Sequence, residues 1–120
     1  MELVGETTVK GDWVDRTVGL HGVESDIVFM RTPDGHSQIE FARFKSPIGV
    51  STDLKNEHAN TLGKHRIMFT VDDIRDTVAR LQNHGGELVG EIVQYEDAYL
   101  LCYLLGPEGI MLALAEEMSD

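Results

Sequence analysis

An internal repeat constrains the fold of this chain more than any other feature. Residues 2–6 read Glu-Leu-Val-Gly-Glu, and residues 87–91 read the same. Each copy leads into apolar, strand-like sequence and then into a Pro-acidic-Gly turn, at residues 33–35 and 107–109. Motifs repeated in the same order are typical of a chain built from two copies of one supersecondary unit. The sequence therefore predicts two related modules.

The second module is predicted to be complete. Residues 66–71 alternate apolar and polar side chains, the period-two pattern of a strand with one buried face. Ile74, Val78 and Leu81 then lie on one stripe of a helix, and Asp72 is the expected N-cap. Three further strands are expected near residues 88–94, 99–105 and 111–115. The order is strand, helix, strand, strand, strand, which is a βαβββ unit.

The first module is predicted to start at its second strand. Its strands are expected near residues 3–9, 23–32 and 38–44, and no segment before them corresponds to residues 65–86 of the second module. The pentapeptide and the Pro turn are 31 positions apart in the first module and 20 in the second, which leaves 11 extra residues. We expect these extra residues in a loop around residues 19–24.

The partial first module has two interpretations, which both stay open. We place the modules at residues 1–45 and 64–120, with a connector at residues 46–63. In one interpretation the chain is a fragment, or a reading frame begun at an internal methionine, and the natural protein is longer. In the other, the exposed sheet edge pairs with a second copy, because unpaired edges invite pairing. The second interpretation predicts a homodimer, with exchange of elements as one form of it.

Paired βαβββ units with a Pro-acidic-Gly turn before the last strand resemble the vicinal oxygen chelate superfamily. That group includes glyoxalase I, the bleomycin-resistance proteins and the extradiol dioxygenases. Residues 34–41, 66–74 and 106–114 carry the resemblance. It implies an α+β fold in which curved, mixed sheets of two modules form a cleft, with helices on the outside. It also implies that metal enzymes of the group take a ligand from the first and the last strand of each module.

The resemblance leaves the metal site incomplete in this chain. The usual histidine falls at Arg66, which stays protonated and cannot donate a lone pair to a metal. The usual glutamate of the second module falls at Ala113, whereas Glu40 keeps the carboxylate in the first. His65 could ligate only if its strand slipped by one residue, which would turn the apolar side chains outward. A divalent metal held by Glu40 and His65 is thus the alternative, and an Arg66–Glu40 ion pair is the favoured interpretation.

Other candidates are side chains suited to a small-molecule pocket. The expected ligand-binding residues are Trp13, Glu40, Arg66, Met68, Tyr99 and Tyr103. Aromatic rings with polar tips suit such a pocket, although each tyrosine also has an alternative as a core residue with its hydroxyl hydrogen-bonded. Cys102 should face the helix as a small core residue, because it alternates with Tyr103 along the strand.

Composition narrows the classes of partner. The net charge is −11, from 21 acidic and 10 basic residues, and such a surface repels phosphate backbones, so we expect no nucleic acid. The longest nearly apolar run, residues 99–105, is too short to cross a bilayer, so we expect no membrane partner. The one cysteine excludes an internal disulfide and fits a reducing cytoplasm.

These observations favour a cytoplasmic protein that binds a small molecule in the cleft between its modules, as bleomycin-resistance proteins do, without the full metal site of the superfamily. The alternative is a metal-dependent lyase, isomerase or dioxygenase of the same superfamily. An assembly module without a ligand is the third possibility, because fold alone does not determine chemistry.

Overall fold

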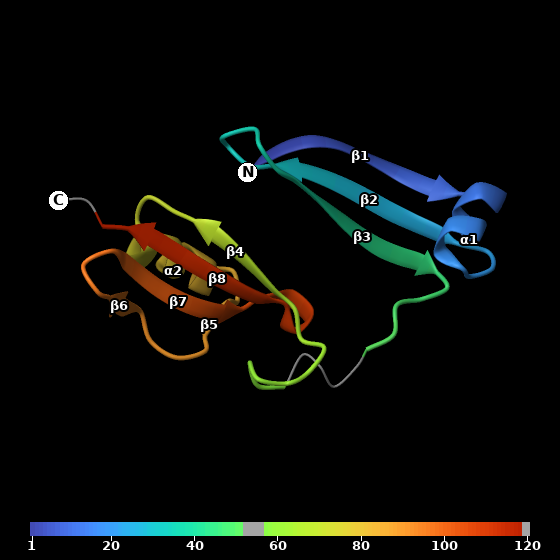
Figure 1. The fold of residues 1–120 in the computed structure, drawn as a ribbon. Coiled ribbons are helices and arrows are strands. Elements are labelled where there is room, and N and C mark those ends of the chain that lie inside the picture. Colours follow the sequence, from blue (N-terminus) through green and yellow to red (C-terminus); the bar gives the residue numbers. More distant parts are fainter. Residues whose placement is uncertain (52–56, 119–120) are drawn as a thin grey trace. The chain divides into compact units, whose positions relative to one another are not determined.

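The chain folds as two compact units, Met1–Val50 and Ser51–Asp120 (Figure 1). The computed structural model describes residues 1–51 and 57–118, so part of the expected connector lies outside the described residues. Each unit has its own β-sheet, and the predicted α+β class is confirmed. No helix among the described residues is long and apolar enough to cross a membrane.

Unit 1 is a three-stranded antiparallel sheet in the order β1-β2-β3. Its elements are β1 (Glu2–Lys10), α1 (Asp12–Val18), β2 (Glu24–Arg31) and β3 (Gln38–Ser46). Unit 2 is a mixed sheet in the order β4-β8-β7-β5, in which β4 runs parallel to β8 and β6 pairs with β7. Its elements are β4 (Arg66–Thr70), α2 (Ile74–Asn83), β5 (Glu87–Leu88), β6 (Val93–Tyr95), β7 (Tyr99–Leu105) and β8 (Met111–Glu117).

The strand register bears out the internal repeat. The first pentapeptide starts with Glu2 opposite Arg31, and the second starts with Glu87 opposite Leu105. Arg31 and Leu105 each stand two residues before the proline of their turn. The two pentapeptides therefore pair with equivalent positions of the following strand, so the repeat in sequence is a repeat in structure.

The Pro-acidic-Gly turns also match. The Gly35 amide donates to the Thr32 carbonyl at 2.9 Å, and the Gly109 amide donates to the Gly106 carbonyl at 3.3 Å. Both glycines have a positive φ, 77° and 78°, a conformation that a residue with a Cβ rarely adopts. Each turn thus closes its hairpin with a hydrogen bond to the carbonyl three residues earlier, donated by a glycine of positive φ.

The repeated pentapeptides differ in how far their strands continue. In β1 the pairing shifts between Leu3 and Gly5 and then resumes, which is a β-bulge. In the second copy the strand stops at Leu88 and pairing resumes only at Val93. The single strand expected over residues 88–94 is therefore wrong, since residues 89–92 interrupt it between β5 and β6.

The extra residues of unit 1 lie between β1 and β2, where the expected loop is present at residues 19–23 but follows a helix, α1, that the sequence did not predict. α1 buries Val14, which is 5% exposed. The Asp15 carboxylate then accepts from the backbone amides of Gly22 at 3.0 Å and Val23 at 2.8 Å. This carboxylate fixes the chain where it returns from α1 to β2. The contact helps the short polar segment of α1 to form a helix.

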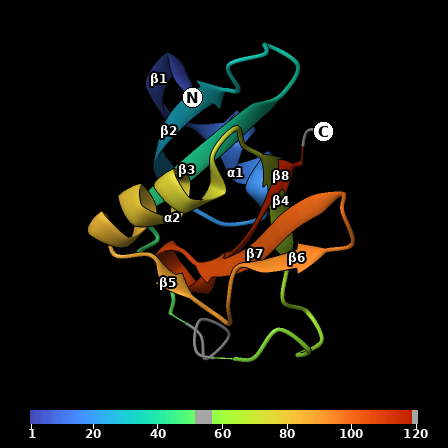
Figure 2. The same ribbon diagram turned by 90° about the vertical axis from the view of Figure 1, so that its left-hand side faces the viewer.

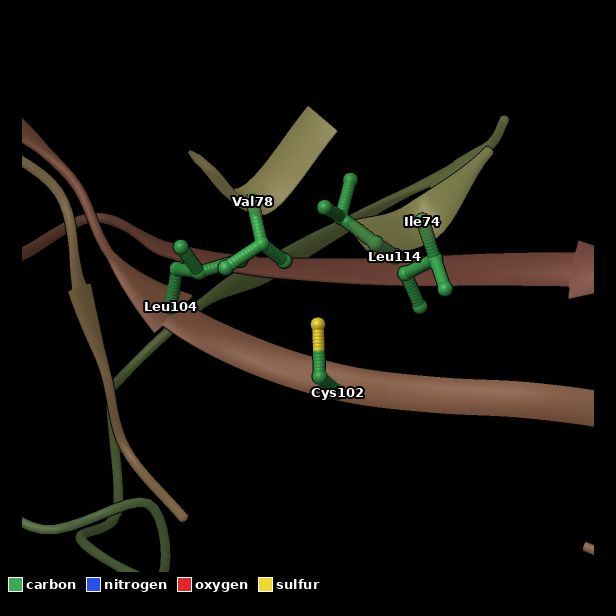
Figure 3. Packing of buried hydrophobic residues seen from close by; sticks show 5 residues of the cluster. All are labelled: Ile74, Val78, Cys102, Leu104 and Leu114. Carbon is green, nitrogen blue, oxygen red and sulfur yellow. The ribbon is translucent and has the colours of Figure 1, made fainter. Parts of the chain in front are cut away.

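The hydrophobic core of unit 2 lies between α2 and one face of its sheet (Figures 1 and 2). Figure 3 shows its five buried residues, Ile74, Val78, Cys102, Leu104 and Leu114. The two of them on α2, Ile74 and Val78, lie on one stripe of the helix with the predicted i, i+4 spacing. The prediction that Cys102 faces the helix is confirmed.

Two carboxylates satisfy the first turn of α2. Asp73, not the expected Asp72, is the N-cap, and its side chain accepts from the Asp76 amide at 3.0 Å. The expectation for Asp72 is wrong because the helix begins one residue later. Glu116 of β8 accepts from the Ile74 amide at 2.8 Å. The last strand therefore anchors the start of the helix, a contact that spans 42 positions of sequence.

Candidate functional site

The candidate site lies on the face of the unit 2 sheet that α2 does not cover. Cys102 and Leu114 point toward α2, so their neighbours along β7 and β8 point to the other side. Pairing sets Tyr103 beside Ala113 and Ala113 beside Met68 in one row across three strands. We call this side the helix-free face; its side chains include Arg66, Met68 and Thr70 of β4, Met111, Ala113, Ala115 and Glu117 of β8, and Tyr99, Leu101 and Tyr103 of β7.

The helix-free face has a low central row between taller side chains. Ala113 and Ala115 on β8 are buried, and each carries only a methyl group. Met68 of β4, which is 65% exposed, stands beside Ala113 on one side, and the half-buried Tyr103 and Leu101 of β7 stand beside Ala113 and Ala115 on the other. The predicted alternation of β7, with Tyr99, Leu101 and Tyr103 on one face, is confirmed by this register.

Arg66 leans across the sheet onto an aromatic ring. Its guanidinium carbon lies 4.6 Å from the centre of the Tyr103 ring, within the range of a cation–π contact. Arg66 is exposed, whereas Tyr103 is half-buried. No carboxylate in the described part of unit 2 forms an ion pair with Arg66. Its charge is therefore held in place by a ring and available to an anion.

The pairing of the two last strands tests the alignment of Glu40 with Ala113. Glu40 pairs with Phe29 in unit 1, and Ala113 pairs with Tyr103 in unit 2. Phe29 and Tyr103 each stand four residues before the proline of their turn. Ala113 therefore occupies the position that holds a carboxylate in unit 1, and it offers no donor atom.

The residues present do not fit a metal ion held in the way that the resemblance implies. Arg66 cannot coordinate, because its guanidinium keeps all its protons, and Ala113 has no oxygen. His65 directly precedes β4 and is exposed. No group of three or more His, Cys, Asp and Glu side chains within residues 1–51 and 57–118 could hold a metal. Glu40 is the one donor kept at an expected position, fewer than a divalent site needs.

Two predicted site residues belong to the other unit. Glu40 lies on β3 of unit 1 and is exposed. Trp13 lies on α1 and is 57% exposed. The structure thus gathers Arg66, Met68 and the tyrosines on one face of unit 2, while the Arg66–Glu40 ion pair and a role for Trp13 stay predictions.

Unit 1 has an open hollow of about 650 Å³ on its own sheet, lined by Glu6, Thr8, Asp26, Val28, Phe41, Arg43 and neighbouring backbone. The Thr8 hydroxyl donates to Asp26 at 2.7 Å, and Lys45 and Arg43 lie 3.3 and 3.4 Å from the same carboxylate. The Thr8 hydrogen bond, helped by the two cations, holds the pKa of Asp26 below its ordinary value. The charge of the Asp26 carboxylate in this hollow is thus already compensated by its hydroxyl donor and two cations.

Cys102 offers no nucleophile. Burial against α2 raises the pKa of its thiol above the ordinary value, so the thiol stays protonated at neutral pH. Sequence reasoning missed the two alanines that make the central row low. Their signal was present in the sequence, because Ala113 and Ala115 lie two residues apart and so put two small side chains on one face of the last strand.

Comparison with known proteins identifies the family. Neither a protein-family profile nor a curated protein matches the chain. A solved structure, that of a glyoxalase family protein from Bacillus cereus, is 48% identical to it. The match covers 98% of this chain and 78% of that one, with a TM-score of 0.90. At this identity and coverage, the chain belongs to the glyoxalase family.

Proposed function

We propose that the chain binds a small molecule on the helix-free face of unit 2, as a metal-independent binding protein of the vicinal oxygen chelate superfamily. The observation that carries the proposal is the low row of Ala113 and Ala115 between the larger side chains of β4 and β7, with Arg66 held over Tyr103. Membership of the glyoxalase family supports it, because that places the chain among proteins named for a small-molecule reaction.

The chemistry of the face supports binding more than catalysis. Binding sites for small molecules are mostly apolar and aromatic, with a few fixed polar groups. Leu101 and Tyr103 supply half-buried apolar surface, Met68 and Tyr99 supply exposed surface, and Arg66 supplies one fixed charge. Among the described residues, no hydrogen bond on this face joins a nucleophilic side chain to a general base. The face can therefore hold and orient a molecule with its own residues.

A thermal-melt screen of small molecules tests the proposal. A ligand at a hundred times its Kd stabilises a protein by about 2.7 kcal/mol, which raises the melting temperature of a small domain by several degrees. We expect at least one compound to raise the melt, and Met68→Ala to reduce that rise. Gln82→Ala, on the exposed side of α2, is the matched control and should leave the rise unchanged. Stabilisation that Met68→Ala and Gln82→Ala affect equally would contradict binding on this face.

A metal-dependent lyase, isomerase or dioxygenase is the second candidate, and the exposed carboxylate of Glu40 is the observation that favours it. Metal analysis of the protein, purified without a metal-chelating tag, separates the two candidates. We expect no stoichiometric metal, and no rise of the melt with Ni, Zn, Fe(II), Mn or Mg that Glu40→Ala abolishes. A stoichiometric metal lost in Glu40→Ala would replace our proposal with the enzyme.

We also propose that two copies of the chain associate, and that the protein works in the cytoplasm. β3 pairs with β2 on its inner side, and its outer edge pairs with no strand within unit 1, residues 1–50. This open edge supports the association, because free edges template further pairing. The buried, unpaired Cys102 supports a reducing compartment. Light scattering of the purified chain should give the mass of a dimer, and a monomer at all concentrations would contradict association. Exchange of elements stays a prediction from the sequence.

A further inference from the structure

We propose that the molecule bound on the helix-free face is a carboxylate with an apolar or aromatic body, and that Arg66 binds its carboxylate group. This inference rests on the proposed binding function and names the chemical class of its ligand. The juxtaposition that carries it is a cation without a carboxylate partner in the described part of unit 2, held over a ring beside apolar side chains.

The position of the guanidinium suits an acceptor with two oxygens. A guanidinium that lies over a ring uses its flat surface for that contact, and its N–H groups point outward from its edge. Those donors match a carboxylate in bidentate geometry, which a single-point ammonium cannot do. Tyr103 therefore holds the guanidinium of Arg66 in place in advance and leaves donors at its edge available.

The pairing status of the basic residues supports the assignment. Arg16, Arg31 and Arg80 each pair with a carboxylate of their own unit, as do the two cations beside Asp26. Arg75 on α2 forms no ion pair among the described residues either, but the recorded ring contact is that of Arg66. In a chain of net charge −11, carboxylates are abundant, yet Arg66 contacts an aromatic ring. An arginine placed in this way is a binding site for an anion supplied from outside.

The other side chains of the helix-free face determine which kind of ligand body would fit beside the carboxylate. The rows next to Arg66 hold Met68, Leu101 and Tyr103, together with the two alanines. Glu117 is the carboxylate at the far end of the face, beside Tyr99, and lies six residues along β8 from Met111, the partner of Arg66, or about 20 Å. At physiological salt such a distance exceeds the Debye length of about 8 Å, so Glu117 does not neutralise Arg66. The face thus offers a cation at one end and apolar surface beyond it.

Matched pairs of acids and amides test this inference. Phenylacetate and phenylacetamide, and octanoate and octanamide, differ in the charge of one group but share a body. We expect each acid to bind at least tenfold more tightly than its amide, measured by NMR titration, with affinity that falls as salt rises. Arg66→Gln should lower the affinity for the acids about tenfold to a hundredfold and leave that for the amides nearly unchanged.

Two further variants distinguish the effect of the planar guanidinium geometry from the effect of positive charge alone. Arg66→Lys keeps a cation but loses the planar fork, so its affinity for the acids should fall between those of the parent and Arg66→Gln. Arg75→Gln removes one positive charge from α2, where the side chain is exposed, and should leave both affinities unchanged. Melting curves of all three variants show whether each remains folded before affinities are compared.

The outcomes distinguish the two proposals. Acids and amides that bind equally well on the helix-free face would overturn the carboxylate class and leave the binding function standing. An effect of Arg75→Gln as large as that of Arg66→Gln would also overturn the inference, because net charge alone would then explain it. Failure of all four compounds, while another compound raises the melt in a manner sensitive to Met68→Ala, would likewise overturn the class and keep the function.

Discussion

The two units share a strand pattern and differ in what covers it. In unit 2, Leu104 and Leu114 are 1% and 3% exposed beneath α2. Within the described residues of unit 1, no helix corresponds to α2. Phe41, at the position equivalent to Leu114, is 49% exposed. The comparison teaches that turn and register residues determine how strands pair, whereas a separate covering element determines whether their apolar face becomes a core.

The substitutions between the units follow from this difference. Asp26 of β2 is equivalent to Leu100 of β7. Each lies three residues before the equivalent aromatic residues, Phe29 and Tyr103. Arg43 of β3 stands where Glu116 of β8 caps α2. A charged pair in place of a leucine and a helix cap is compatible with an open face, so unit 1 keeps the pairing without the core.

The largest expected effect comes from a matched pair of truncations, one beneath α2 in unit 2 and one on the uncovered face of unit 1. Leu104→Ala should lower the free energy of unfolding by about 2–5 kcal/mol, because it leaves a cavity beneath α2. Met30→Ala, at the equivalent position, should cost about 1 kcal/mol or less, because that side chain is half-buried on an uncovered face. Urea unfolding followed by circular dichroism measures both. Equal losses would show that the face of unit 1 is covered as well as that of unit 2.

A smaller effect is expected at the start of α2. Glu116→Ala removes the acceptor of the Ile74 amide and should destabilise unit 2 by about 1–2 kcal/mol. Glu117→Ala is the neighbouring control, since its exposed side chain points to the other face and should change stability by about 0.5 kcal/mol or less. If the two variants unfold at the same urea concentration, the contact between β8 and α2 does not stabilise the helix.

The smallest expected effect is a pH dependence confined to unit 1. The pKa of Asp26 is lowered in the folded state, chiefly by the Thr8 hydrogen bond. Its contribution to stability is therefore present above the ordinary aspartate pKa of about 3.9 and is lost as the pH falls through the lower folded value. The side chain is 29% exposed, so solvent partly screens the effect. Unfolding curves of the parent and Asp26→Asn should differ slightly at pH 7 and converge as the pH falls below about 3.9; a gap that widens toward low pH would contradict this sign.

Sequence reasoning predicted most of the fold because its signals were local or repeated. Alternation over residues 66–71 located β4, the two Pro-acidic-Gly turns located both hairpins, and the repeated pentapeptide identified the duplication. α1 was missed because its seven residues carry one buried side chain, Val14, too few for a periodic pattern. The break between β5 and β6 was missed because the pentapeptide itself is identical to the one that stays in register in β1.

The candidate site was predicted in its parts but not in its central contact. Alternation placed Arg66 and Met68 on one face of β4 and Tyr103 on the same face of β7. The contact of Arg66 with Tyr103 depends on two further facts: β8 lies between those strands, and Ala113 leaves room above it. Neither fact is local in sequence, since β4 and β8 are 45 positions apart. The interpretation of Arg66 as a partner of Glu40 came instead from the resemblance.

The measurement that tests the account most directly is a chemical-shift map of the isotope-labelled protein with the most stabilising compound of the melt screen. We predict that the shifts concentrate on the helix-free face of unit 2, at Met68, Leu101 and Tyr103, and spare Val28 and Phe41 in the hollow of unit 1. Shifts concentrated at Val28 and Phe41, with none at Met68 or Tyr103, would contradict the account. That result would mean that the uncovered face of unit 1, not the helix-free face of unit 2, is the binding site.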